Sequence, residues 1–367
     1  MEQQEMLDNE ALTRARDCTL TERLTRLWKN LKRYKFIANA GAYISSNVLL
    51  KAAGFLLTPL WARFLTPADY GITGTLSAYS GVLTTLLMMG LHGAVVRQYY
   101  DHLDDPASQK SYITSVVLFQ MLISGAAVLI LNVLGPTLWG VFTADKISFD
   151  PYARIMLWSA CIATWIRIPQ SLYQAQQKAR SYVYVGYGRF GLNVLANFVL
   201  IVALRQGAYG KLLGQLISGA IVAAAVIGLA FRRWFTPHVE WKHIRASLAF
   251  GLPLVPHLVA AWALQAADRL ILERFVSLDD LGLYNFGYTL GMVMSFLVTG
   301  INQAWSPYYY RMMENRDKPE ERIIQVVSIY IAVIGFICLL GVLFAGEIVH
   351  LILPQSYFGV VPYIAPV

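Results

Sequence analysis

The chain has 367 residues, of which 56% are hydrophobic and only 14% are charged, and its mean hydropathy is +0.48. An ordinary soluble domain is about 45–50% apolar, so this composition excludes a soluble globular protein and indicates a polytopic membrane protein. The net charge of +8 does not indicate a nucleic-acid partner, because the basic residues follow a membrane topology. We expect no metal and no cofactor, since Cys18, Cys161 and Cys338 form no ligand pair and no catalytic or nucleotide-binding motif is present.

Residues 1–35 form a polar leader whose second half interleaves leucines and Trp28 with basic side chains. At helical spacing this is a basic amphipathic segment, the kind that lies on an anionic membrane surface. The apolar run that follows is too long for a cleaved signal peptide, and no small-residue cleavage site closes it. We therefore predict a cytoplasmic leader on the inner leaflet, with a plainly solvated tail as the alternative.

Nine apolar runs follow, each close to the roughly 20 residues that a helix needs to cross a bilayer. They lie near residues 36–62, 71–93, 113–135, 152–172, 182–204, 210–231, 248–272, 282–304 and 323–345. A tenth run begins near Phe358. The connecting segments are too short to hold an extramembrane catalytic domain.

Lys and Arg residues are distributed unevenly between alternate connecting segments. With the N-terminus in the cytoplasm, the inner side carries 21 of them and the outer side carries seven. Because cytoplasmic loops hold the excess of positive residues, we predict that the N-terminus lies on the cytoplasmic side.

A nine-residue stretch occurs twice: Arg63–Gly71 matches Arg274–Gly282 at a constant offset of 211 residues. Both copies fall on the predicted outer face, and a parallel repeat that returns to the same side contains an even number of spans, here six. We predict an all-α polytopic membrane protein with two parallel six-helix lobes around a central cavity. Residues 36–246 would form the first lobe, and residues 247–367 a second lobe that is incomplete in this chain. A chance likeness of two loops is the alternative.

Two predicted spans carry a cation on a polar face. Lys51 follows Asn47 in the first span, and Arg189 precedes Asn193 and Asn197 in the fifth. Charges inside a membrane are costly and usually functional, and the first six predicted spans contain no acidic residue. The two cations are therefore candidates for binding a phosphate or pyrophosphate. The alternative is a structural role in polar contacts between helices.

The seventh predicted span carries Trp262, Gln265 and Asp268. Trp262 lies deep enough in the span to line a cavity. Asp268 is the deepest carboxylate of the chain and is a candidate for carrying a coupling cation. A structural ion pair with Arg269 or Lys51 is the alternative.

Three stretches resemble the polysaccharide transporters that flip lipid-linked O-antigen units, a family of the multidrug and oligosaccharidyl-lipid exporter superfamily. They are Thr58–Gly71, Gly90–Tyr100, and Asp268–Leu272 running on to Gly282-Leu283-Tyr284. The resemblance implies two lobes around an alternately opening cavity in the bacterial inner membrane. It implies a transporter rather than an enzyme, which moves an undecaprenyl-diphosphate-linked oligosaccharide from the inner to the outer leaflet. Its partners would be this lipid-linked oligosaccharide, membrane lipids, and glycan polymerase and chain-length proteins.

On this hypothesis each candidate residue has a role. Lys51 and Arg189 would bind the diphosphate, Trp262 would line the cavity and Asp268 would couple an ion. Polar sugar atoms would meet the amides of Asn47, Asn193, Asn197 and Gln265.

Three rival functions make different demands on the sequence. A cation-coupled multidrug exporter of the same superfamily would need acidic residues in the first lobe. A membrane enzyme of glycan assembly, such as a polymerase or ligase, would need a long outer loop with catalytic groups. A membrane scaffold would have no wet cavity.

Overall fold

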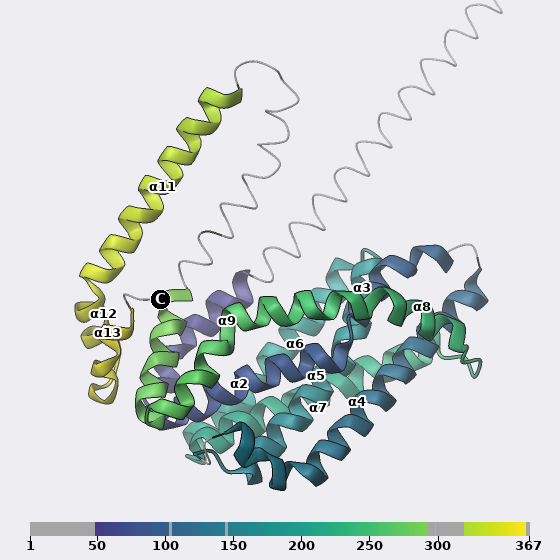
Figure 1. Ribbon diagram of the computed structural model, residues 1–367, viewed down its shortest axis with the longest axis horizontal. Helices are drawn as coiled ribbons and strands as arrows, with labels where there is room; N and C mark the ends of the chain where they lie inside the picture. The colour runs from purple at the N-terminus through teal and green to yellow at the C-terminus, as the bar shows by residue number, and fades with distance from the viewer. Residues whose placement is uncertain (1–47, 103–104, 144–145, 293–297, 299–318, 365–367) are drawn as a thin grey trace, which may run out of the picture.

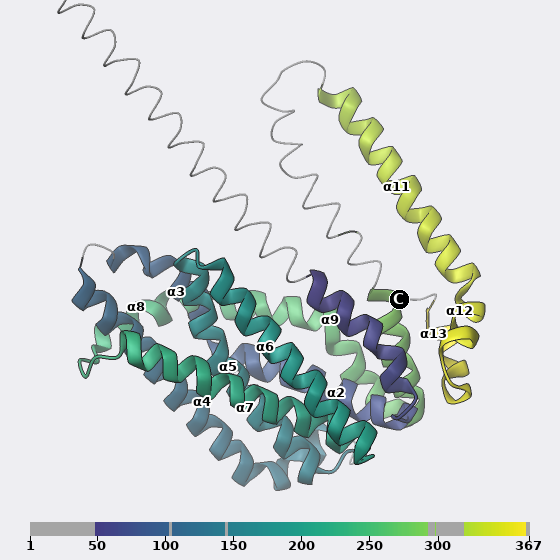
Figure 2. The ribbon, with the colours of Figure 1, turned by 180° about the vertical axis from the view of Figure 1, so that it is seen from behind.

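A computed structural model describes residues 48–102, 105–143, 146–292, 298 and 319–364, which are helical and contain no strand. The predicted leader and Asn47 lie outside the described residues. Helices α2 to α9 pack side by side in an elongated bundle (Figures 1 and 2). The all-α membrane fold predicted from composition is confirmed.

The helices follow the predicted apolar runs in chain order. The first is Val48–Ala62, followed by α2 (Pro67–Met88), α3 (Leu91–Gln98), α4 (Pro106–Phe142), α5 (Arg154–Ala175), α6 (Ala179–Asn197) with η3 (Phe198–Ala203), and α7 (Gly207–Trp234). The later part has α8 (Trp241–Gly251), η4 (Leu252–Leu254), α9 (Val255–Phe275), a helix over residues 278–292, α11 (Pro319–Leu343), α12 (Ala345–Ile352), η5 (Gln355–Val360) and α13 (Val361–Ile364).

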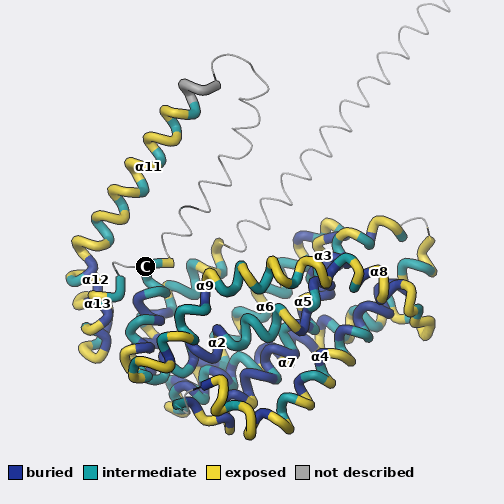
Figure 3. Tube along the Cα trace, in the orientation of Figure 1, coloured by how far each residue is buried: buried dark blue, intermediate teal, exposed yellow. Residues whose placement is uncertain are grey.

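Five of the described helical segments are long and apolar enough to cross a membrane, and a bent pair makes up to six. The five are α4, α6 with η3, α7, α8 with α9, and the main part of α11. The sixth would be α2 with α3, which are bent by 45°. Many residues inside the bundle are buried, whereas α11 stands apart from it and is largely exposed (Figure 3).

The bend between α2 and α3 depends on a left-handed turn at Met89 and Gly90, whose φ angles are 48° and 70°. A side chain on Gly90 would also collide with the backbone carbonyl of Gly251. Only glycine combines this conformation with so close an approach of another backbone. The turn thereby brings α3 against α8 and sets the direction in which α3 leaves the bundle.

The two copies of the repeated stretch form the same local structure. Thr66 caps α2 in a capping box, in which its hydroxyl and the Asp69 carboxylate satisfy each other's backbone N–H groups. In the second copy the Asp280 N–H donates to the Ser277 hydroxyl at 3.1 Å, and that hydroxyl donates to the Asp280 carboxylate at 2.6 Å. Each copy therefore starts a helix by the same mechanism.

The two helix starts also pack directly against each other. A Cβ on Gly71 would collide with the carbonyl of Leu278, and a Cβ on Gly282 would collide with the carbonyl of Pro67. Pro67 and Leu278 are related by the same offset as the two glycines, so the contact is reciprocal, as around a two-fold axis. This geometry supports an internal duplication, while the lobe boundaries at 36–246 and 247–367 stay a prediction.

We expect Gly71→Ala and Gly282→Ala each to destabilise the protein by about 1–3 kcal/mol, because the added methyl group forces two backbones apart. The measurement is the thermal unfolding midpoint of the purified protein in detergent. Gly228→Ala is the matched control, because a Cβ there meets nothing within 4 Å. Equal midpoints for all three variants would contradict the proposed contact.

Candidate functional site

A cavity of about 440 Å³ lies among α2, α3, α5, α6 and α7, with Leu258 of α9 at its edge. Its volume is within the roughly 300–1,000 Å³ typical of ligand sites. Hydroxyl, amide and basic groups provide most of its polar lining. They are Ser77, Ser80, Thr84, Thr85, His92, Ser159, Arg167, Gln170, Arg189 and Gln215.

One wall of the cavity is a face of α2. Ser77, Ser80 and Thr84 recur at three- and four-residue spacing, which places them on the same side of a helix. The Ser77 hydroxyl donates to the carbonyl of Thr73 at 2.6 Å. Because a hydroxyl oxygen retains acceptor capacity when its proton is used in this way, this wall can accept hydrogen bonds from a polyhydroxylated ligand.

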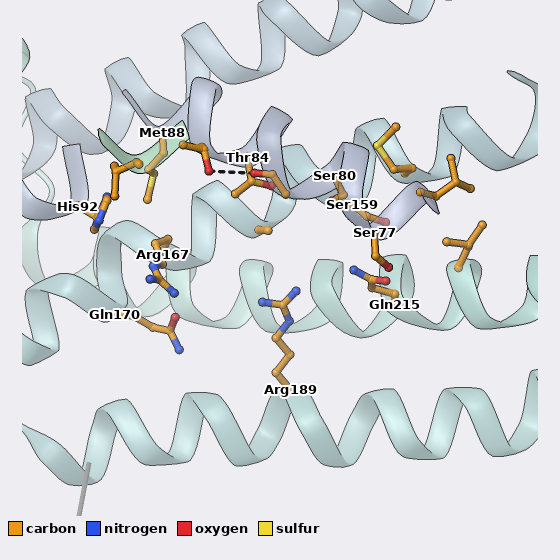
Figure 4. Close-up of a pocket in the computed structure, with 17 residues that line it drawn as sticks. Ser77, Ser80, Thr84, Met88, His92, Ser159, Arg167, Gln170, Arg189 and Gln215 are labelled. Carbon is orange, nitrogen blue, oxygen red and sulfur yellow. Dashed lines mark hydrogen bonds between the residues drawn. The ribbon is translucent and has the colours of Figure 1, made fainter. Parts of the chain in front are cut away.

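The opposite side carries the charge. Arg189 extends from α6 into the middle of the cavity, and Arg167 and Gln170 of α5 lie nearer to His92 (Figure 4). Arg167 and Gln170 share one face of α5 because they are three residues apart. Two different helices thus direct a guanidinium group into the same space.

The cavity is electropositive. An arginine side chain stays protonated in proteins, and none of the described residues that line the cavity is acidic. Charges of one sign between low-dielectric walls attract counter-ions. The site is therefore suited to an anionic ligand that also offers hydroxyl groups.

A second cavity of about 350 Å³ adjoins the first, because His92, Arg167 and Gln170 line both. It adds Arg97 and Tyr182 to the lining. The polar space therefore continues from the middle of the bundle towards α3, and its basic character continues with it.

The two residues predicted to bind the diphosphate lie in different places. Arg189 lines the cavity, whereas Lys51 lies on an exposed position of the helix Val48–Ala62 and does not line it. Asn47 lies outside the described residues. The binding roles of Lys51 and Asn47 stay predictions.

Asn193 and Asn197 connect α6 to α7. The Asn193 amide donates to the Ser218 hydroxyl at 3.3 Å, and the Asn197 amide donates to the Asn193 carbonyl oxygen at 3.0 Å. A side chain on Gly214 would collide with Asn197. This stripe therefore holds two helices together in the present arrangement, and sugar binding by these amides remains a prediction.

Of the predicted residues of α9, Trp262 contacts α2 and Asp268 contacts the helix over residues 278–292. The Trp262 indole donates to the Ala78 carbonyl at 3.1 Å and lies against Gly81, where an added Cβ would be 2.9 Å from the indole nitrogen. Gln265 is exposed. Asp268 accepts a hydrogen bond from the Tyr284 hydroxyl, and its predicted role in ion coupling is not tested by this contact.

The sequence pattern does not assign Arg167 to the site, because a positive residue close to the predicted end of a span is expected for topological reasons. The serines and threonines of α2 were also missed. Their helical spacing was a usable signal, since Ser77, Ser80 and Thr84 form a polar stripe within an apolar run.

We expect Arg189→Gln to stabilise the ligand-free protein, because it removes a charge that the described lining does not neutralise. Asn193→Ala should instead cost about 0.6–2 kcal/mol, as it removes the hydrogen bond from α6 to Ser218 of α7. Thermal unfolding midpoints in one detergent would then move in opposite directions. A lowered midpoint for Arg189→Gln would contradict an uncompensated charge at this position.

Comparison with known proteins identifies the family. The family described as "Polysaccharide biosynthesis protein" matches residues 36–313. Two relatives from Haemophilus influenzae are "Lsg locus putative protein 1", 25% identical over 77% of this chain, and "Uncharacterized membrane protein", 19% identical over 76%. The matched regions cover 68% and 66% of those proteins, so the chain spans about two thirds of their length.

Solved structures identify the fold. An inward-facing multidrug resistance MATE family transporter of the MOP superfamily superposes with a TM-score of 0.65 and 14% identity, over 87% of this chain and 79% of that chain. MATE in the straight conformation gives a TM-score of 0.52 and 16% identity, over 88% and 76% of the two chains. With three quarters of its length matched by the family, the chain belongs to the polysaccharide biosynthesis proteins and is built on the fold of the MATE transporters.

Proposed function

We propose that the protein is a flippase that moves a lipid-diphosphate-linked oligosaccharide across the bacterial inner membrane by alternating access. The observation that carries this proposal is the cavity in which Arg167 and Arg189 face hydroxyl and amide groups. The N-terminus lies in the cytoplasm, and the substrate is an undecaprenyl-diphosphate carrying an O-antigen or another polysaccharide repeat unit. Glycan polymerase and chain-length proteins would act on the product.

The two arginines fit the diphosphate. A guanidinium group offers planar, paired donors that match phosphate oxygens, and charge-assisted hydrogen bonds of this kind are about twice as strong as neutral ones. Two such groups from α5 and α6 can engage the two phosphates together. The saccharide would then lie along the hydroxyl face of α2, which is formed by Ser77, Ser80 and Thr84.

A cation-coupled multidrug exporter is the second candidate, because the chain shares the fold of MATE transporters. Such an exporter would need acidic residues in the first lobe to bind a proton or a sodium ion. The described lining of the larger cavity instead contains arginines, hydroxyls and amides. This lining favours the flippase. The fold shared with MATE transporters also favours transport over a polymerase or ligase activity.

The charge in the cavity provides the principal test. We expect Arg189→Glu and Arg167→Glu to abolish surface glycan when the protein complements a flippase-deficient strain, since each replaces an attraction for phosphate by repulsion. Arg189→Lys should retain part of the activity, because it keeps the charge but not the paired donors. Loss of a charge-assisted hydrogen bond of about 1.5–3 kcal/mol corresponds to about a 10- to 150-fold lower rate.

Arg180→Glu is the matched control. Arg180 lies on α6, as Arg189 does, but it is exposed and does not line either cavity. Membrane levels of all variants would be compared by immunoblot. Normal glycan display by both Arg167→Glu and Arg189→Glu would refute the proposal. Lys51→Glu tests the separate prediction for that residue.

A further inference from the structure

Glu273 lies in the last turn of α9, where α9 contacts α2 and the end of α4. Its exposed fraction is 0%, although a carboxylate is normally kept in water or paired with a cation inside a protein. Its Oε1 atom has no hydrogen-bond partner among the described residues. A buried carboxylate oxygen without a partner is costly to the folded protein.

Tyr79 of α2 is the hydrogen-bonding neighbour of Glu273. The Tyr79 hydroxyl donates to the Phe142 carbonyl at 2.7 Å, and it lies 3.4 Å from Oε2 of Glu273. A hydroxyl has one proton to donate, and the shorter contact uses it. A proton on Glu273 would let the carboxyl group donate to the Tyr79 oxygen across the longer contact.

Two cations lie close enough to act on Glu273 through their charge, but their hydrogen bonds go to backbone carbonyls. Lys146 donates to the backbone carbonyls of Glu273 and Val276 at 2.6 and 2.8 Å. Arg274, which is exposed, donates to the carbonyl of Val141 at 3.3 Å. Within the described part of the chain, neither forms an ion pair with the Glu273 carboxylate.

We propose that Glu273 is a proton-binding site that holds α9 on α2, and that it releases its proton when these helices separate. In the docked arrangement the neutral carboxylic acid is buried and donates to Tyr79. In the separated arrangement the O–H bond breaks, the proton passes to water and the carboxylate becomes hydrated. This role is independent of the identity of the transported substrate.

Separation of α9 from α2 would then depend on pH. The docked state binds one proton that the separated state loses, so a rise in pH favours separation by at most about tenfold per pH unit. The contact joins α9, which belongs to the predicted second lobe, to α2 and α4 of the first. Protonation of Glu273 would therefore favour the closed arrangement of the two parts at this end of the bundle.

The protonation state can be measured directly. In the full-length protein in lipid nanodiscs at neutral pH, infrared spectroscopy should show the C=O band of a buried carboxylic acid. Glu273→Gln should remove this band, whereas Asp268→Asn should leave it in place. A band that persists in Glu273→Gln, or no carboxylic-acid band in the wild type, would overturn the proposal.

A second measurement tests whether protonation of Glu273 controls the separation of α9 from α2. Hydrogen exchange of the backbone amides in α9 is measured from mildly acidic to mildly alkaline pH and corrected for intrinsic exchange rates. Wild-type protection should fall as pH rises. Glu273→Gln, which mimics the neutral acid, should keep its protection over the whole range. Tyr79→Phe should lower the protection several-fold, because the acid loses its acceptor. The same pH dependence in Glu273→Gln and the wild type would refute the coupling.

Discussion

The close backbone contact between Gly71 and Gly282 constrains the rest of the structure. Because neither residue has a side chain, the starts of α2 and of the helix over residues 278–292 meet at backbone distance. The second copy of the repeated stretch follows α9 directly, so this contact also brings the last turns of α9 onto α2. One side of α2 then packs against Trp262 and Glu273 of α9. Another side lines the cavity with serine and threonine.

The two unneutralised arginines of the cavity lower the stability of the folded protein, and this indicates that they serve its function. Arg167 and Arg189 come from different helices and face one space whose described lining contains no carboxylate. A protein that needed only stability would place apolar side chains there. Residues that conflict with stability are typical of functional sites. This lining is complementary to an anion with hydroxyl groups, which supports the proposed lipid-diphosphate-linked sugar.

Sequence reasoning recovered part of the candidate site. Arg189 was found because a cation inside an apolar run is conspicuous, and it does line the cavity. Arg167 was missed because it occurs close to the predicted end of a span, where positive residues are expected for topological reasons. Asn193 and Asn197 lie on the same helix as Arg189 but contact α7. A side chain's position on a helix does not reveal which neighbour it meets, because the rotation of that helix is set by packing.

The sequence by itself determined that this is a polytopic membrane protein, in which order its helices follow, and where the repeat lies. All three depend only on local composition and residue spacing. The capping box at Thr66 and the hydrogen bonds between Ser277 and Asp280 are likewise local features. Only the tertiary structure decided that the two copies of the repeat touch, that Arg167 and Arg189 share a cavity and that Glu273 is buried against Tyr79. These contacts join residues far apart in the chain. They depend on how closely the backbones approach, and a linear pattern of residues does not encode that distance.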